Sequence, residues 1–133
     1  MRIAVLAFVA LVATGCMGRP SSEDQGGRKL SSSTMLDISV TPGGEAPTKL
    51  WTLRCPSGGT LPDAAQACEQ LLQLDDPFAP VPKGASCTQV YGGPQEADVR
   101  GIFRGRPVEA HFDRGNGCEI ARWNKVRFLF PSG

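Results

Sequence analysis

The stretch Ser86-Cys87-Thr88-Gln89-Val90-Tyr91-Gly92-Gly93-Pro94 is the segment around which this chain is organised. Thr88, Val90 and Tyr91 favour extended backbone. Gly92-Gly93-Pro94 cannot continue a strand and predicts a turn. The cysteine near its start offers a covalent tie to another part of the chain. A short extended segment that is tied at one end and turned at the other is typical of a binding loop held rigid and exposed.

The number and spacing of the cysteines limit the classes of protein to which this chain can belong. The chain has 133 residues and five cysteines: Cys16, Cys55, Cys68, Cys87 and Cys118. No Cys-x-x-Cys pair occurs, and the only histidine, His111, has no partner histidine at ligand spacing, so we expect no metal and no cofactor. An exported chain pairs its cysteines, and an odd cysteine needs a separate role. Setting Cys16 aside leaves enough cysteines for two disulfides.

The N-terminus predicts export. Met1-Arg2 is a short positive start, and an almost unbroken apolar run, 3–13, follows it. The run is too short for a spanning helix and is followed by polar sequence, which is typical of a secretory signal over 1–15. Ala13-Thr14-Gly15-Cys16 resembles a bacterial lipoprotein signal, in which the cysteine becomes the acylated N-terminus. We expect an exported protein that is either anchored by lipid at Cys16 to the outer face of the cell membrane or secreted after ordinary cleavage.

Composition separates a tether from a domain. Glycine, serine and charged residues dominate 16–34 and cannot bury enough surface to fold, so this stretch predicts a flexible linker before a domain at 35–133. The formal net charge is +1, and removing 1–15 takes away Arg2 and leaves equal numbers of basic and acidic residues. A nucleic-acid binder is normally basic, so we expect no nucleic-acid partner.

Alternating apolar residues predict strands. Leu36, Ile38 and Val40 lie on one face of the first, and a short loop leads to the second, as in a hairpin. The predicted strands are 35–40, 49–55, 97–103, 108–112 and 126–130.

Helical spacing predicts one clear helix and one short one. Thr60 is the expected N-cap of the first helix, with Asp63 three residues later and Pro62 in the first turn. The short helix is expected at 118–124. Because short turns join most strands, the sheet should be antiparallel with the helices segregated from it, which defines an α+β fold. One apolar stripe marks the first helix: Leu61, Ala64, Ala65, Cys68, Leu71 and Leu72.

From Met35 to Phe130 the chain resembles the bacterial subtilisin-inhibitor family, which are secreted inhibitors of subtilisin-like serine proteases. The resemblance implies a five-stranded antiparallel sheet with two helices packed on one side, and a possible homodimer. It also implies the pairings Cys55–Cys68 and Cys87–Cys118. The segments that carry it are Thr52-Leu53-Arg54-Cys55, Gly58-Gly59-Thr60-Leu61-Pro62, Ala67-Cys68, Cys87-Thr88-Gln89-Val90-Tyr91, Val99-Arg100-Gly101, Gly105-Arg106-Pro107-Val108 and Asn116-Gly117-Cys118-Glu119.

The resemblance also implies a reactive site. In the family the inhibitory bond follows the second residue after the third of the four paired cysteines, which is Cys87 here. This makes Gln89 the P1 residue and Val90 the P1′ residue. An uncharged P1 suits the roomy pocket of subtilisin better than the acidic pocket of trypsin. Asn116 matches an asparagine that supports the loop backbone by hydrogen bonds. The expected protease-contact residues beside the bond are Cys87, Thr88, Tyr91 and Gly92.

Two alternatives stay open from the sequence. Gly92-Gly93 holds one residue more than the family pattern, and extra glycine adds backbone freedom, so a lipid-anchored module with lost or altered inhibitory activity is the second hypothesis. An enzyme is not expected, because no Ser/His/Asp set is visible. Arg100, Arg104 and Arg106 are interpreted as solvated turn charges.

Overall fold

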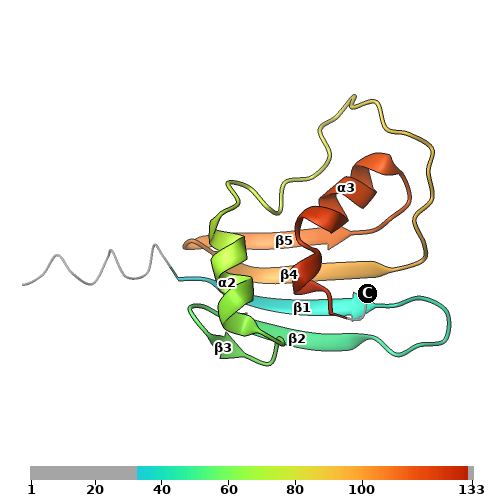
Figure 1. The fold of residues 1–133 in the computed structure, drawn as a ribbon. Helices are drawn as coiled ribbons and strands as arrows, with labels where there is room; N and C mark the ends of the chain where they lie inside the picture. Colours follow the sequence, from blue (N-terminus) through green and yellow to red (C-terminus); the bar gives the residue numbers. More distant parts are fainter. Residues whose placement is uncertain (1–32, 132–133) are drawn as a thin grey trace, which may run out of the picture.

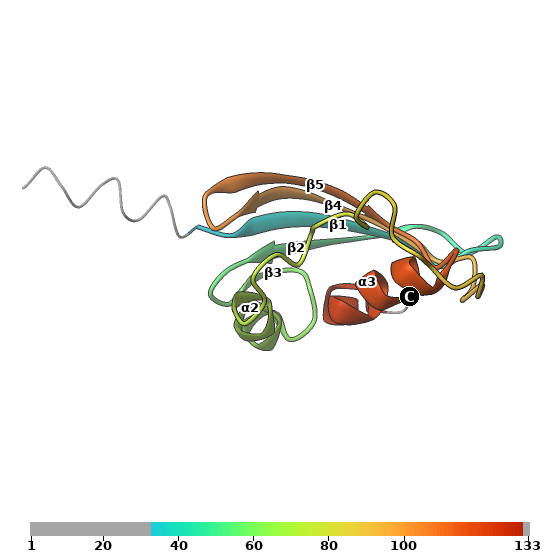
Figure 2. The same ribbon diagram turned by 90° about the horizontal axis from the view of Figure 1, so that it is seen from above.

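The computed structural model describes residues 33–131, which fold into one antiparallel sheet with two helices on one side (Figures 1 and 2). The predicted α+β fold is therefore confirmed. The order across the sheet is β3-β2-β1-β4-β5, with every neighbouring pair antiparallel. The strands are β1 (Met35–Thr41), β2 (Lys49–Arg54), β3 (Gly58–Gly59), β4 (Glu96–Phe103) and β5 (Arg106–Phe112), and the helices are α2 (Ala64–Leu72), α3 (Gly117–Lys125) and the 3₁₀ turn η1 (Arg127–Leu129).

β1 is the centre of the sheet, and its alternation matches the predicted pattern. Leu36, Ile38 and Val40 are at most 2% exposed and face the helices. Burial of such side chains stabilises the fold by about 1.5–3 kcal/mol each. The core is completed from α2 by Ala67, Cys68 and Leu71 and from the C-terminal region by Trp123, Val126, Leu129 and Phe130.

Both expected disulfides are present. Cys55–Cys68 joins the residue after β2 to α2, and Cys87–Cys118 joins the long α2–β4 connection to α3. The first bridge therefore fixes a helix on the sheet. The second fixes a connection that has no regular secondary structure.

The predicted last strand is wrong. Residues 127–129 form a 3₁₀ turn instead, and Val126, Leu129 and Phe130 are buried while Phe128 is only partly buried. This three-and-four spacing points the apolar side chains at the helix-covered face of the sheet. The strand that completes the five is β3, which lies between the predicted strand 49–55 and the expected N-cap Thr60 and pairs with β2.

The predicted start of the first helix is also wrong. α2 begins at Ala64 after Asp63, which has a left-handed backbone and gives no side-chain cap. The Thr60 hydroxyl accepts a hydrogen bond from the backbone amide of Thr52, at 2.9 Å. The Thr60 hydroxyl, which was expected to cap the helix, is therefore hydrogen-bonded to Thr52 of β2 instead.

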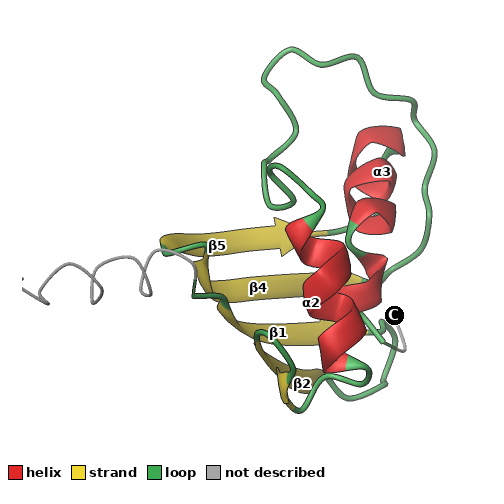
Figure 3. Cartoon of the chain, turned by 60° about the vertical axis from the view of Figure 1, so that its left-hand side comes forward, coloured by secondary structure: helices red, strands yellow, loops and turns green. Residues whose placement is uncertain are grey.

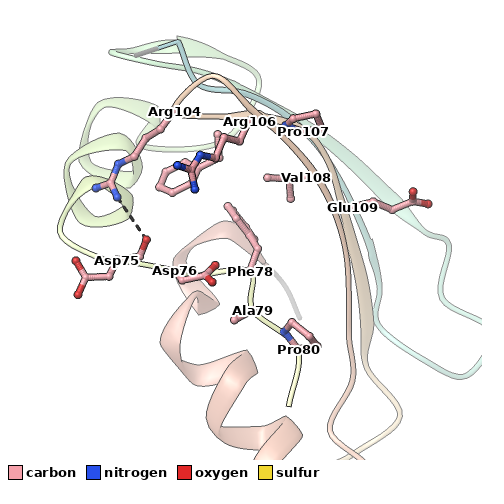
Figure 4. A pocket seen from close by; sticks show the side chains of 11 residues that line it. Asp75, Asp76, Phe78, Ala79, Pro80, Arg104, Arg106, Pro107, Val108 and Glu109 are labelled. Carbon is pink, nitrogen blue, oxygen red and sulfur yellow. Dashed lines mark hydrogen bonds between the residues drawn. The ribbon is translucent and has the colours of Figure 1, made fainter. Parts of the chain in front are cut away.

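Arg104 is not a solvated turn charge. Its guanidinium donates to the Leu72 carbonyl at 2.6 Å and reaches the Asp75 carbonyl at 3.5 Å, so it satisfies carbonyls at the end of α2 (Figure 4). A cation at this position also complements the helix dipole. Arg100, by contrast, makes only an exposed ion pair with Glu109.

The start of the described chain is held on the sheet. Thr34 is buried, its carbonyl accepts from the Cys55 amide at 3.0 Å, and its hydroxyl accepts from the Arg104 amide at 3.3 Å. The expected signal, the lipidated Cys16 and the expected tether up to residue 32 lie outside the described residues, and only 33–34 of the tether are described. Among residues 33–131, no helix is long and apolar enough to cross a membrane.

Candidate functional site

The connection from α2 to β4 stands out from the body of the molecule and passes beside α3 (Figures 1 and 3). Near its C-terminal end it carries Gln89, Val90 and Tyr91, all exposed. Val90 is 55% and Tyr91 69% exposed, although both are large apolar side chains. Within the described chain these three residues make no hydrogen bond or ion pair, so both side chains and backbone are free to meet a partner.

The backbone on both sides of these three residues is held by Arg114 and by the first two residues of α3, Gly117 and Cys118. On the N-terminal side, Cys87 is bonded to Cys118, and the Thr88 carbonyl accepts from the Gly117 amide at 2.9 Å. On the C-terminal side, the Gly92 amide donates to the Arg114 carbonyl at 2.7 Å. The backbone of residues 89–91 is thus fixed at both ends.

The contact at residue 117 is close enough that a side chain there would meet Thr88. A Cβ atom there would lie 2.0 Å from Oγ1 of Thr88, closer than side-chain atoms approach. The first residue of α3 therefore comes this close to the loop without a side chain, and the amide of Gly117 reaches the Thr88 carbonyl.

Gly92 is packed as well as hydrogen-bonded. A Cβ at this position would lie 2.9 Å from the end of the Ile120 side chain and 3.2 Å from Cβ of Arg114. The structure therefore gives Gly92, the first residue of the Gly92-Gly93 pair, a fixed place beside Ile120 of α3.

Asn116 lies behind the loop, but its side chain does not bond to it. Its Oδ1 accepts from the Glu119 amide at 3.0 Å, which makes Asn116 the N-cap of α3. Among the described residues, the loop backbone bonds are made by Gly117 and Arg114 instead. Asn116 acts on the loop through the helix end that it caps.

The sequence reasoning missed three residues that hold the loop: Arg114, Gly117 and Ile120. Gly117 carried a local signal, because it lies between the helix cap and a disulfide cysteine. Arg114 uses its main-chain carbonyl, and its side chain also donates to Gln95 at 3.3 Å. Every residue type has a main-chain carbonyl, so the sequence pattern carries no signal for this role of Arg114.

Hollows of the described chain lie away from the exposed loop. A cavity of about 570 Å³ lies between the end of α2 and the β4–β5 turn (Figure 4). Its walls carry both signs of charge, from Asp75, Asp76, Arg104, Arg106 and Glu109. It is at the far end of β4 from the loop. Residues 33–131 contain no cluster of three side chains that could hold a metal ion.

These features define a small disulfide-bonded α+β domain that presents one exposed, backbone-held loop. A family model described as subtilisin inhibitor-like matches residues 32–116, which include the loop and Asn116. The chain belongs to the subtilisin inhibitor-like family, a family of protease inhibitors.

The solved structures include chains that are similar to this one. The chain is similar to a chain in the crystal structure of Streptomyces caespitosus sermetstatin in complex with Bacillus licheniformis subtilisin. The match has 22% identity and a TM-score of 0.46, and it covers 74% of this chain and 97% of that chain. No curated protein matches the chain.

Proposed function

We propose that the chain inhibits a subtilisin-like serine protease by presenting the Gln89–Val90 bond as a substrate-like bond. The observation that carries this proposal is the fixing of backbone on both sides of that bond. Thr88 is held by Gly117 and Gly92 by Arg114, while the residues between them remain exposed. Family membership supplies the class of partner.

The expected mode of binding follows from this geometry. An extended segment adds to the protease cleft as a strand through backbone hydrogen bonds, and its side chains enter pockets. The side chain of Gln89 enters the pocket that sets much of the specificity. Little conformational entropy is lost on docking, because the ends of the segment are already fixed.

The same hydrogen bonds and the disulfide would keep the two ends of the chain together after the Gln89–Val90 bond is cut. After hydrolysis of Gln89–Val90, the new C-terminus stays attached through Thr88 and Cys87, and the new N-terminus stays attached through Gly92. The two ends therefore remain close, and religation competes with release. The protease performs the chemistry, so this chain needs no catalytic group of its own.

The alternative, a module that has lost inhibition, rests on the extra glycine. The bond from Gly92 to Arg114 and the contact with Ile120 remove the reason to expect a loose loop. Inhibition is therefore the function we favour.

Titration of the purified chain into subtilisin and into trypsin tests the proposal. We expect stoichiometric inhibition of subtilisin, weaker inhibition of trypsin, and loss of inhibition in Val90→Pro, since proline removes an amide donor and restricts the preceding backbone. No inhibition of either protease at micromolar excess would remove the proposal.

We also propose that export and a lipid anchor at Cys16 place the inhibitor at the outer face of the cell membrane. The support is the signal-like sequence 1–15 and the odd cysteine, which is left over once two disulfides form. The intact mass of the protein from membranes should exceed that of the chain from Cys16 by the lipid. An unmodified N-terminus would exclude the anchor.

A homodimer through the uncovered sheet face is proposed on the family resemblance. That face carries Met35 and Leu50, which are 44% and 75% exposed. Sedimentation velocity of the chain and of Leu50→Lys tests it: dimerisation weakened by the substitution supports the proposal, and a monomer at high concentration removes it.

A further inference from the structure

One side chain of α3 joins three parts of the fold. Nε of Arg122 donates to the Ala79 carbonyl at 2.8 Å, and Nη1 donates to the His111 carbonyl at 3.2 Å and to Glu119 at 2.6 Å. Its guanidinium carbon lies 4.6 Å from the centre of the Phe112 ring. The side chain is only 16% exposed.

Ala79 is the point at which the α2–β4 connection leaves the core. The preceding residue, Phe78, is buried and packs edge-on against Phe103 and Phe112, with ring centres 5.4 and 6.5 Å away. Between Ala79 and Cys87, the described backbone hydrogen bond is local, from Ala85 to Pro82. We name residues 80–86 the approach segment. Arg122 therefore holds the N-terminal end of the approach segment, at Ala79, and the disulfide at Cys87 holds its C-terminal end.

The same side chain also fixes α3 on the sheet. His111 and Phe112 lie in β5, and α3 carries Gly117 and Cys118, which hold the loop at Thr88 and Cys87. Arg122 thus acts on both supports of the N-terminal side of the loop. A planar guanidinium can bond several acceptors at once, whereas lysine carries a single point charge.

We propose that Arg122 is a positioning residue of the inhibitor, which keeps the approach segment and α3 in the arrangement that makes Gln89–Val90 an inhibitory bond rather than a substrate bond. This inference rests on the proposed function. Without the guanidinium, the segment before Cys87 gains freedom, and α3 loses a tie to β5. The protease then meets a looser loop that it cleaves and releases faster.

Three variants test this proposal. Arg122→Met keeps the apolar stem and removes the donors, Arg122→Lys keeps the charge beside Glu119, and Arg127→Met is the matched control, because Arg127 is exposed and makes no side-chain hydrogen bond in the described chain. For Arg122→Met we expect an inhibition constant for subtilisin raised about tenfold and faster cleavage at Gln89–Val90. Arg122→Lys should show part of the same loss, and Arg127→Met none.

A measurement on the free protein separates this proposal from the proposed function. Backbone NMR order parameters report fast motion without any protease. We expect them to fall over residues 80–88 in Arg122→Met and to stay unchanged in Arg127→Met, whether or not the wild-type chain inhibits subtilisin. If the chain does not inhibit, the proposed function fails, while this fall would still support the positioning role. Order parameters and cleavage rates equal to wild type in both Arg122 variants would overturn the inference, as would a loss of inhibition that only follows a lowered melting temperature.

Discussion

The backbone amide of Gly117 lies 2.9 Å from the carbonyl oxygen of Thr88, so the first residue of α3 holds the residue before Gln89. A Cβ at residue 117 would lie 2.0 Å from Oγ1 of Thr88, so a side chain there would force Thr88 or the helix end to move. The position of the helix end and the shape of the loop are therefore one geometric unit.

Gly117→Ala should weaken inhibition of subtilisin by about tenfold or more, because a misplacement of even 1 Å is costly where binding depends on a preformed geometry. Combining it with Thr88→Ala should restore part of the loss, since that change removes the atom the new Cβ would meet. Inhibition constants of the two single variants and the double variant form the test. Gly115→Ala is the control, because its Cβ would meet only a side-chain oxygen of Asp113, at 3.1 Å. Wild-type inhibition by Gly117→Ala would show that the close contact is not needed.

Removing the Cys87–Cys118 bridge by paired serine substitution should turn the chain from an inhibitor into a substrate. The bridge holds the N-terminal side of the reactive segment, so its loss frees the cut end after hydrolysis. Removing Cys55–Cys68 in the same way should cost about 3 kcal/mol of folding free energy. While folded, that second variant should inhibit subtilisin without rapid cleavage. Mass spectrometry of the reaction with subtilisin distinguishes the two, and equal cleavage of both variants would contradict the assignment.

Gln89→Lys should shift inhibition towards trypsin by supplying a positive charge to an acidic specificity pocket. Gln89 is exposed, so the change should leave the folding stability unaltered. The ratio of inhibition constants for trypsin and subtilisin is the measurement, and Gln66→Lys, at an exposed position of α2, is the control. An unchanged ratio would show that Gln89 is not the P1 residue.

Arg104→Met should lower the free energy of unfolding by about 1 kcal/mol without changing inhibition. Arg104 caps the end of α2, at the opposite end of β4 from the loop. Thermal unfolding and inhibition measured on the same preparations test both parts. Arg106→Met is the matched control, since Arg106 is exposed and makes no side-chain hydrogen bond or ion pair in the described chain. Equal melting temperatures for the two variants would remove the capping role.

Strands with one buried face were predictable from the sequence. Leu36, Ile38 and Val40 alternate in the chain and are buried as the alternation requires. The prediction of a C-terminal strand was wrong, because the apolar residues Val126, Phe128 and Phe130 also occupy every second position. Burial there follows Val126, Leu129 and Phe130, since the chain comes directly from α3 and packs its turn on the helix-covered face of the sheet.

The sequence allowed prediction of an exposed segment at 89–91, but not of the residues that support it. The cysteine spacing and the family resemblance indicated the exposed bond and both disulfides. The holding contacts come from a main-chain amide and a main-chain carbonyl, which lie far from the loop in sequence. Main-chain groups are the same in every residue type, so only the folded arrangement identifies the ones that act.

The most direct test of the central claim starts from the cut chain. The chain hydrolysed at Gln89–Val90 is purified and incubated with a trace of subtilisin, and the intact mass is followed over time. Because Thr88 and Gly92 hold the two new ends, the account predicts that the cut form still inhibits and that uncut chain reappears until both forms reach a constant ratio. Hydrolysis at another bond, or a cut form that neither inhibits nor religates, would contradict it.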